Sequence, residues 1–172
     1  DLNLTLRANI GSNDEILAFN DQLIKSVGLF RSEFIYIDKT TKPSLEDQIK
    51  INDELDSKFS ETIVFRTLDI GGDKQVPYLK LPKEENPFLG VRGIRYSLEE
   101  EALFREQIVS ILTSKLNNKV KIMFPMVSIL DDFIKAKNIV IEESEKLNIK
   151  TPPLGIMVET PSTALNAELY VG

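Results

Sequence analysis

Five apolar runs divide the chain, and each is followed by a stretch in which apolar residues recur three or four positions apart. The runs are rich in β-branched and large apolar side chains without strict polar alternation, which is typical of strands buried on both faces. The stretches between them have the spacing of amphipathic helices. The predicted strands are residues 2–10, 27–37, 62–70, 120–127 and 154–158.

Helix starts are indicated by a serine with an acidic residue three positions later. A serine hydroxyl at this place accepts a hydrogen bond from a free helix N–H, and the acid favours the positive end of the helix dipole. A fifth start is predicted at Thr160, because Pro161 would occupy the first helical position, where its missing N–H is not needed. The serine starts are Ser12 with Glu15, Ser44 with Asp47, Ser97 with Glu100 and Ser128 with Asp131.

Strands that alternate with helices predict an α/β fold with a parallel sheet and right-handed crossovers. One predicted helix carries an apolar stripe of Phe104, Ile108, Ile111 and Leu112, which would face such a sheet. A doubly wound sheet and a (β/α) barrel both remain open. A complete barrel of TIM type needs about 250 residues, so this chain would form an incomplete parallel barrel of about five of eight βα units.

Composition and charge restrict the cellular compartment and the partners that we expect for this chain. The chain has 21 basic and 27 acidic residues, a net charge of −6, no Cys and no His. Without Cys there is no disulfide framework, which fits a cytoplasmic protein. The clustered basic excess of nucleic-acid binders is missing and no apolar run approaches the ~20 residues of a membrane helix, so neither nucleic acid nor membrane is an expected partner. Any imidazole base or phosphohistidine must come from elsewhere.

Arginines gather where the active sites of parallel α/β proteins lie, at the carboxyl ends of the strands. Arg7, Arg31 and Arg66 lie late in or just after predicted strands, and Arg92 and Arg95 follow a long irregular segment, residues 71–93. Such a long segment is interpreted as a functional loop. Arginine is the bidentate donor that carboxylates and phosphates require, so the pattern favours an anionic ligand.

Two purely structural interpretations stay open for these charged residues. Any one arginine could instead be buried against a carboxylate such as Glu33 or Asp69. Glu159 ends the fifth predicted strand, where it could serve either as a partner of the helix dipole or as an oxygen ligand for Mg²⁺ opposite the arginines.

Five motifs in order resemble the C-terminal phosphoenolpyruvate-binding domain of the enzyme I family, the phosphoenolpyruvate–protein phosphotransferases of the bacterial sugar phosphotransferase system. They are GLFRSEF at 28–34, FRTLDIGGDK at 65–74, PKEENPFLGVRGIR at 82–95, MFPM at 123–126 and MVETP at 157–161. The resemblance implies a cytoplasmic, dimeric (β/α)₈ barrel. In this family Mg²⁺-bound phosphoenolpyruvate passes its phosphoryl group to a His on an N-terminal domain, which serves the phosphocarrier protein HPr.

The resemblance also implies roles for individual residues. By motif, Arg31 and Arg66 look like the arginines that grip the phosphate and carboxylate of phosphoenolpyruvate, and Arg92 matches a further arginine near the site. Glu159 looks like one of two carboxylates that hold Mg²⁺. The other metal ligands, a later arginine and the proton-donating Cys of the family would follow position 172, so no residue here is assigned as catalytic.

The chain is therefore expected to be an excised fragment, residues 1–172 of the barrel, without the N-terminal phosphohistidine domain or the last barrel units, and inactive alone. Open sheet edges, with Ile63, Ile122, Phe124 and Ile156 facing an unfilled barrel interior, predict a homo-oligomer or a marginally stable, aggregation-prone chain. Two alternatives remain. One is a fragment of a phosphoenolpyruvate synthase or pyruvate phosphate dikinase relative, and the other is a non-catalytic binding or assembly module.

Overall fold

A computed structural model describes residues 4–37, 39–72, 76–79, 81 and 83–171. Five strands form one parallel sheet in the order β1-β2-β3-β4-β5. Each predicted strand run contains one of them, and the runs are longer because they include the loops that flank each strand. The strands are β1 (Ala8–Ile10), β2 (Val27–Arg31), β3 (Ile63–Arg66), β4 (Val120–Phe124) and β5 (Leu154–Ile156).

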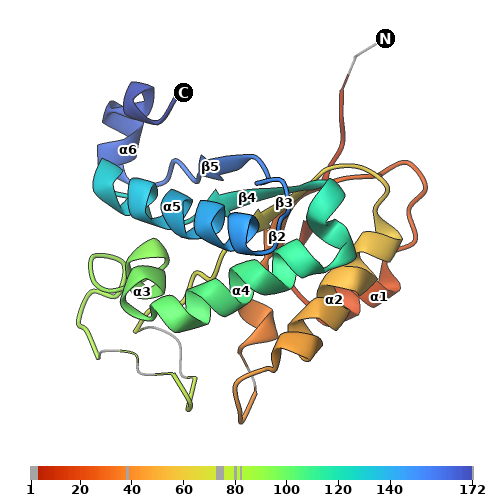
Figure 1. Ribbon diagram of the computed structural model, residues 1–172, viewed down its shortest axis with the longest axis horizontal. Coiled ribbons are helices and arrows are strands. Elements are labelled where there is room, and N and C mark those ends of the chain that lie inside the picture. The colour runs from red at the N-terminus through yellow and green to blue at the C-terminus, as the bar shows by residue number, and fades with distance from the viewer. Residues whose placement is uncertain (1–3, 38, 73–75, 80, 82, 172) are drawn as a thin grey trace.

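Helices follow the strands as the alternation predicts (Figure 1). The α-helices are α1 (Asn13–Ala18), α2 (Leu45–Lys58), α3 (Ile94–Glu99), α4 (Glu101–Thr113), α5 (Leu130–Lys146) and α6 (Pro161–Leu165). Three short 3₁₀ turns complete the described part of the chain: η1 (Ser32–Ile35), η2 (Lys115–Asn118) and η3 (Ala167–Tyr170). Among the described residues, no helix is both long and apolar enough to cross a membrane.

Three of the five predicted helix starts are confirmed. Ser12, Ser44 and Thr160 each accept a hydrogen bond from the third residue of their helix, and Ser44 forms a full capping box with Asp47. The other two are wrong. Ser97 lies inside α3, because that helix already begins after Gly93 and the chain bends again at Glu100 to start α4. The cap of α5 is Ile129, one residue after the predicted Ser128, and it offers no side-chain hydrogen bond.

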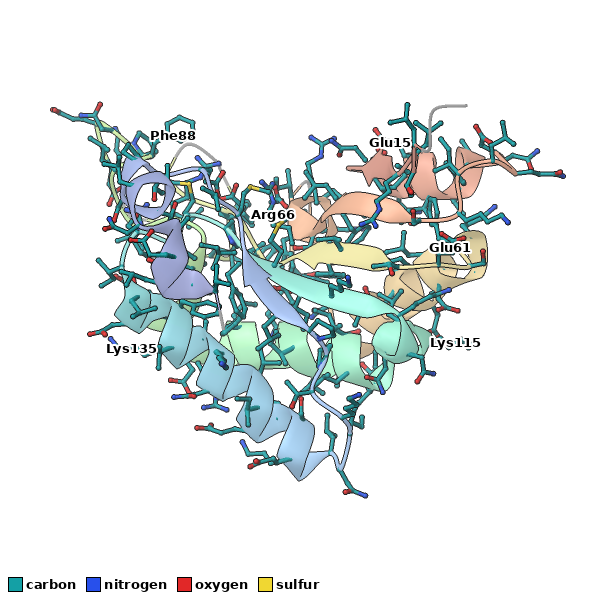
Figure 2. The ribbon with its side chains drawn as sticks, turned by 90° about the horizontal axis from the view of Figure 1, so that it is seen from above. Glu15, Glu61, Arg66, Phe88, Lys115 and Lys135 are labelled. Carbon is teal, nitrogen blue, oxygen red and sulfur yellow. The ribbon has the colours of Figure 1, made fainter. Side chains whose placement is uncertain are left out.

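The winding of the sheet decides between the two architectures that the sequence leaves open. Consecutive strands are neighbours throughout, whereas a doubly wound sheet reverses its strand order and carries helices on both faces. Here α2, α4 and α5 cover the same face of the sheet, as Figures 1 and 2 agree. The fold is therefore α/β with the winding of an incomplete (β/α) barrel, in which β1 and β5 are the open edges.

The core lies between the sheet and these helices, which corrects the predicted direction of four side chains. Ile63, Ile122 and Phe124 are fully buried in one cluster with the stripe of α4, and the half-buried Ile156 packs against that cluster. They face the helices and not the barrel interior. Because side chains alternate along a strand, the bare face carries the residues between them, Val64 and Arg66 of β3 and Lys121 and Met123 of β4.

The long loop predicted at 71–93 carries no helix or strand in its described part. It ends where Gly93 donates its N–H to the carbonyl of Ile70 (3.3 Å) and α3 begins. Asp73 and Lys74 of the Gly-Gly-Asp-Lys motif, Pro82, and the predicted strand residues Leu2 and Asn3 lie outside the described residues. The loop therefore leaves β3 and returns close to its end, beside the candidate site.

Candidate functional site

Two of the predicted arginines lie side by side at the carboxyl ends of neighbouring strands. Arg31 ends β2 and Arg66 ends β3, and the two are partners in the parallel register. Arg7, by contrast, precedes β1 and does not lie at the carboxyl end of a strand. The prediction of three arginines at corresponding strand ends is therefore wrong for Arg7, because the strand begins only at Ala8.

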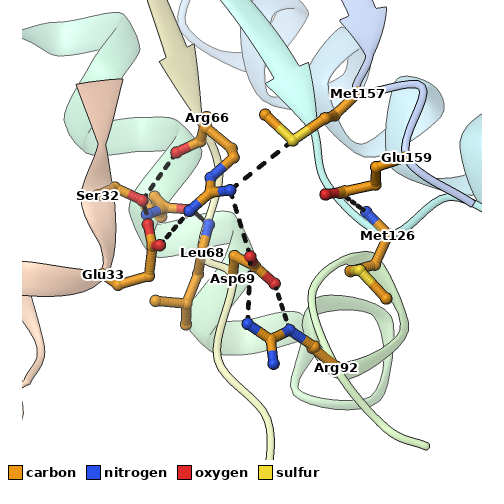
Figure 3. Close-up of polar contacts among 10 residues, drawn as sticks. Ser32, Glu33, Arg66, Leu68, Asp69, Arg92, Met126, Met157 and Glu159 are labelled. Atoms are coloured by element: carbon orange, nitrogen blue, oxygen red, sulfur yellow. Dashed lines mark hydrogen bonds and ion pairs between the residues drawn. The ribbon is translucent and has the colours of Figure 1, made fainter. Parts of the chain in front are cut away.

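Arg66 is a nearly buried cation held by two carboxylates (Figure 3). Its side chain is 10% exposed; Nη2 forms a short ion pair with Glu33, and Nη1 lies 3.3 Å from Oδ2 of Asp69. Nη1 also lies 3.7 Å from the sulfur of Met157, on the loop after β5. The structural interpretation that paired an arginine with Glu33 or Asp69 thus holds for Arg66, in the same place where the ligand interpretation put it.

Asp69 joins Arg66 to a second arginine. Arg92, at the end of the long loop, donates from Nε to Oδ1 of Asp69 at 2.9 Å and from Nη2 to Oδ2 at 3.5 Å. Arg92 is buried, and its guanidinium lies 4.5 Å from the ring centroid of Phe88. A carboxylate between two guanidinium groups fixes the orientation of both. The predicted Arg92 therefore belongs to the same cluster as Arg66.

Arg31 differs from these two because it is exposed. Its guanidinium lies over Gly11, at the start of the loop after β1, where a Cβ would approach Nη2 to 2.0 Å. A side chain at position 11 would therefore displace the guanidinium. The glycine leaves room for Arg31 at the open rim of the sheet.

Glu159 lines an open cavity of about 780 Å³ together with Asp69 and Arg92. One of its oxygens accepts the N–H of Met126 at 2.7 Å, and the carboxylate is exposed. Thr160, which caps α6, also donates to the carbonyl of Val127 at 2.7 Å and so ties this loop to the one after β4. The cavity is lined by Asp69, Phe88, Leu89, Arg92, Arg95, Met126, Ser128, Glu159, Thr160, Pro161 and Ser162.

The site presents an excess of unsatisfied hydrogen-bonding capacity. Within the part of the chain that the structure describes, Nε of Arg66 and Oε2 of Glu33 are buried without a hydrogen-bond partner, although buried polar atoms are normally paired. An anion that displaced the neighbouring side chains would find an unused donor at Nε of Arg66. Among the described residues there is no group of three His, Cys, Asp or Glu side chains that could enclose a metal ion. The carboxylates of Glu159 and Asp69 both line the cavity.

Replacement of Glu33 by Gln tests how burial acts on its carboxyl group. Burial raises the pKa of Glu33 above its ordinary value, and the nearby Arg66 opposes this only in part. With a raised folded pKa the native state binds more protons than the unfolded state, so stability falls as pH rises through the window above about 4.3. We expect the wild type to gain free energy of unfolding relative to Glu33→Gln as pH is lowered from 7 towards 4.3. Chemical denaturation at several pH values measures this difference. A wild type that loses stability relative to the variant on acidification would show that the ion pair with Arg66 outweighs burial.

Two buried polar residues support the cluster and are missed by the sequence reasoning, which considered only charged groups. Ser32 follows Arg31 and is fully buried, and Gln107 is buried on α4. Their hydrogen bonds reach the backbone of residues 66 and 68. A signal for Gln107 was present, because this amide interrupts the apolar stripe of Phe104, Ile108 and Ile111.

Comparison with known proteins finds a matching family and several similar relatives. Residues 2–171 match the family described as PEP-utilising enzyme, PEP-binding domain. The chain is 42% identical over 173 residues to the phosphoenolpyruvate-protein phosphotransferase of Bacillus subtilis (strain 168), with 96% of this chain and 30% of that protein covered. It is 41% identical over 177 residues to the protein of the same name from Priestia megaterium, with 99% and 31% covered. For that of Mycoplasma capricolum the values are 40% over 171 residues, 96% and 30%.

The chain thus spans about 30% of the length of the curated relatives it matches. The match runs through the strand-end arginines, the long loop and the Glu159 segment, and the sequential parallel sheet agrees with it. With a family match over nearly every residue, this chain belongs to the PEP-utilising enzymes and comprises part of their PEP-binding domain.

Proposed function

We propose that Arg31, Arg66 and Arg92 together bind phosphoenolpyruvate. The observation that carries the proposal is the register of β2 and β3, which sets Arg31 and Arg66 side by side at the carboxyl end of the sheet. Phosphoenolpyruvate carries a phosphate and a carboxylate, and each is an anion that a guanidinium can bind with two parallel hydrogen bonds. The family and the names of the relatives agree with this ligand.

Within the proposed site the three arginines have different tasks. Arg31 is exposed and reaches the ligand first, whereas Arg66 and Arg92 are held by Asp69 in fixed orientations. Glu33 occupies Nη2 of Arg66, so ligand binding must share or displace this carboxylate. An orientation fixed before binding lowers the entropic cost of holding an anion.

Mg²⁺ is the proposed cofactor, with Glu159 as its ligand on this chain. The exposed carboxylate fits such a role, because Mg²⁺ is commonly held by one or two carboxylates together with substrate phosphate oxygens and water. The hydrogen bond from Met126 N–H fixes one oxygen and leaves the other for the ion. When bound, Mg²⁺ offsets the negative charge of the phosphoryl group as it leaves.

For the protein as a whole we propose a phosphoenolpyruvate–protein phosphotransferase of the sugar phosphotransferase system, acting in the cytoplasm as a homo-oligomer. The chain, residues 1–172, would be its partial phosphoenolpyruvate-binding barrel, completed by further βα units at the open edges. We propose as the acceptor of the phosphoryl group a His outside these 172 residues, which include no His, with onward transfer to HPr. The shared name of the relatives supports this reaction.

Calorimetric titration of this chain with phosphoenolpyruvate and Mg²⁺ tests the site. We expect saturable binding that Arg66→Lys weakens about ten-fold or more, since Lys keeps the charge but loses the two-pronged contact. Arg105→Lys is the control, because Arg105 pairs with carboxylates on the outer helices α4 and α5. No binding by the wild type, or binding by Arg66→Lys within two-fold of it, would refute the site.

A phosphoryl-transfer assay tests the assignment of the missing parts. With phosphoenolpyruvate, Mg²⁺ and a purified His-bearing acceptor domain, we expect this chain alone to form no phosphohistidine above a control without it. Appreciable transfer would show that the residues of this chain suffice for catalysis.

A further inference from the structure

Gln107 is a buried amide that reaches from the outer helix layer to the candidate site. It lies on α4 at 2% exposure, among apolar residues that pack on the sheet. Its Oε1 accepts the backbone N–H of Leu68 at 3.1 Å, and its Nε2 donates to the hydroxyl of Ser32 at 3.1 Å. Both the oxygen and the nitrogen of the side-chain amide therefore form hydrogen bonds.

Ser32 continues this connection to the arginine itself. Its hydroxyl donates to the carbonyl oxygen of Arg66 at 2.8 Å and is fully buried. Ser32 stands between Arg31 and Glu33 in the chain, and Leu68 stands just before Asp69. One amide and one hydroxyl thus join the two backbone segments that carry four charged groups of the site.

These hydrogen bonds lie just beyond the end of β3, where the chain has left the sheet. The last ladder bond beyond β3 is donated by Thr67 N–H to the carbonyl of Met123. The next N–H, that of Leu68, is buried, and Gln107 is its acceptor. A buried donor without an acceptor is costly, so without Gln107 this segment would move to find another partner or water.

A buried hydroxyl elsewhere in the outer helices provides the comparison. Ser144 of α5 is fully buried, and its hydroxyl donates to the carbonyl of Val140 at 2.7 Å. This bond lies within one helix and involves none of the charged groups of the site. If Gln107 and Ser32 served only to satisfy the core, their loss would resemble the loss of the Ser144 hydroxyl.

We propose that Gln107 is a positioning residue, which acts through Ser32 and the Leu68 N–H to hold Arg66 and Asp69 in the arrangement that binds the anion. The identity of that anion as phosphoenolpyruvate rests on the proposed function. The positioning itself does not, because it can be measured without a ligand. Gln107 does not touch the ligand and is not a catalytic residue.

Backbone amide exchange of this chain tests the positioning directly. In Gln107→Met, which keeps the side-chain volume, we expect the Leu68 amide to exchange about ten-fold faster relative to the core amide of Ile122. Ser32→Ala removes a single hydroxyl and should accelerate it in the same direction, so the test survives if the Met variant folds poorly. Ser144→Ala is the control, because it removes a buried hydroxyl outside this network, and it should leave the ratio unchanged. An unchanged ratio in both site variants, or an equal rise in the control, would overturn the proposal.

Titration with phosphoenolpyruvate and Mg²⁺ then links positioning to binding. We expect about ten-fold weaker binding by Gln107→Met and partial rescue by Gln107→Glu, because the carboxylate still accepts from Leu68 N–H but no longer donates to Ser32. Ser144→Ala should bind as the wild type does. Equal binding by wild type and Gln107→Met would refute the positioning role. A wild type that binds no phosphoenolpyruvate would refute the proposed function, and the exchange ratio would still decide the role of Gln107.

Discussion

Replacement of Arg66 by Met is expected to lower the free energy of unfolding by about 3–5 kcal/mol. The variant leaves the nearly buried Glu33 without the cation that pairs with it, whereas Asp69 keeps its ion pair with Arg92. Losing one member of a buried ion pair costs far more than losing a surface pair, because the remaining charge is neither solvated nor paired. Denaturation by urea, followed by circular dichroism, measures the loss.

Arg31→Met is the matched control for this prediction. Arg31 occupies the equivalent register position on β2 but is exposed, so its replacement should cost about 0.5 kcal/mol or less. The double variant Arg66→Met with Glu33→Gln should recover part of the loss, since a neutral amide then replaces the carboxylate that lost its arginine. Equal stability of the two single Met variants would mean that Arg66 is not a buried ion-pair partner.

Phe124→Ala is expected to cost about 3–5 kcal/mol of stability. Phe124 is fully buried, and its ring lies 6.2 Å from that of Phe104 on α4 and 6.0 Å from that of Phe133 on α5. Truncation removes the side chain that joins both helices to β4 and leaves a cavity. The same unfolding experiment measures the loss.

Met123→Ala provides the comparison, because this neighbouring residue points to the bare face and is only half-buried. We expect a loss of about 1 kcal/mol there, in proportion to the smaller apolar area that is buried. The pair of variants reports which face of β4 packs on helices. A larger loss at Met123 than at Phe124 would reverse that assignment.

Local patterns in the sequence predict the five strands and three of the five helix starts. Each strand lies within a predicted apolar run, and Ser12, Ser44 and Thr160 cap their helices because a hydroxyl followed by a free N–H is a contact between near neighbours. Ser97 fails because nothing in the four-residue pattern distinguishes a cap from the interior of a helix that began earlier, at Ile94.

The tertiary structure decided which side chains of each strand face the helices. In β3 the sequence Ile-Val-Phe-Arg is apolar at three successive positions, so alternation does not reveal whether Ile63 or Val64 faces the helices. The helices settle this by packing on one face only, which buries Ile63 and Phe65. The strand order is likewise a property of the assembled sheet, and it alone separates the barrel winding from the doubly wound one.

The candidate site was likewise predictable from the sequence only in part. The sequence by itself placed Arg31 and Arg66 at strand ends and Glu159 before a helix, because residue type and position along an element are local properties. Which carboxylate pairs with which arginine, and that Gln107 joins them, depends on contacts between residues 23 positions apart for Arg92 with Asp69 and 39 for Leu68 with Gln107. These pairings form only once the sheet and α4 have packed together. Local sequence does not predict them, because the fold of the intervening chain determines which partners come within hydrogen-bonding distance.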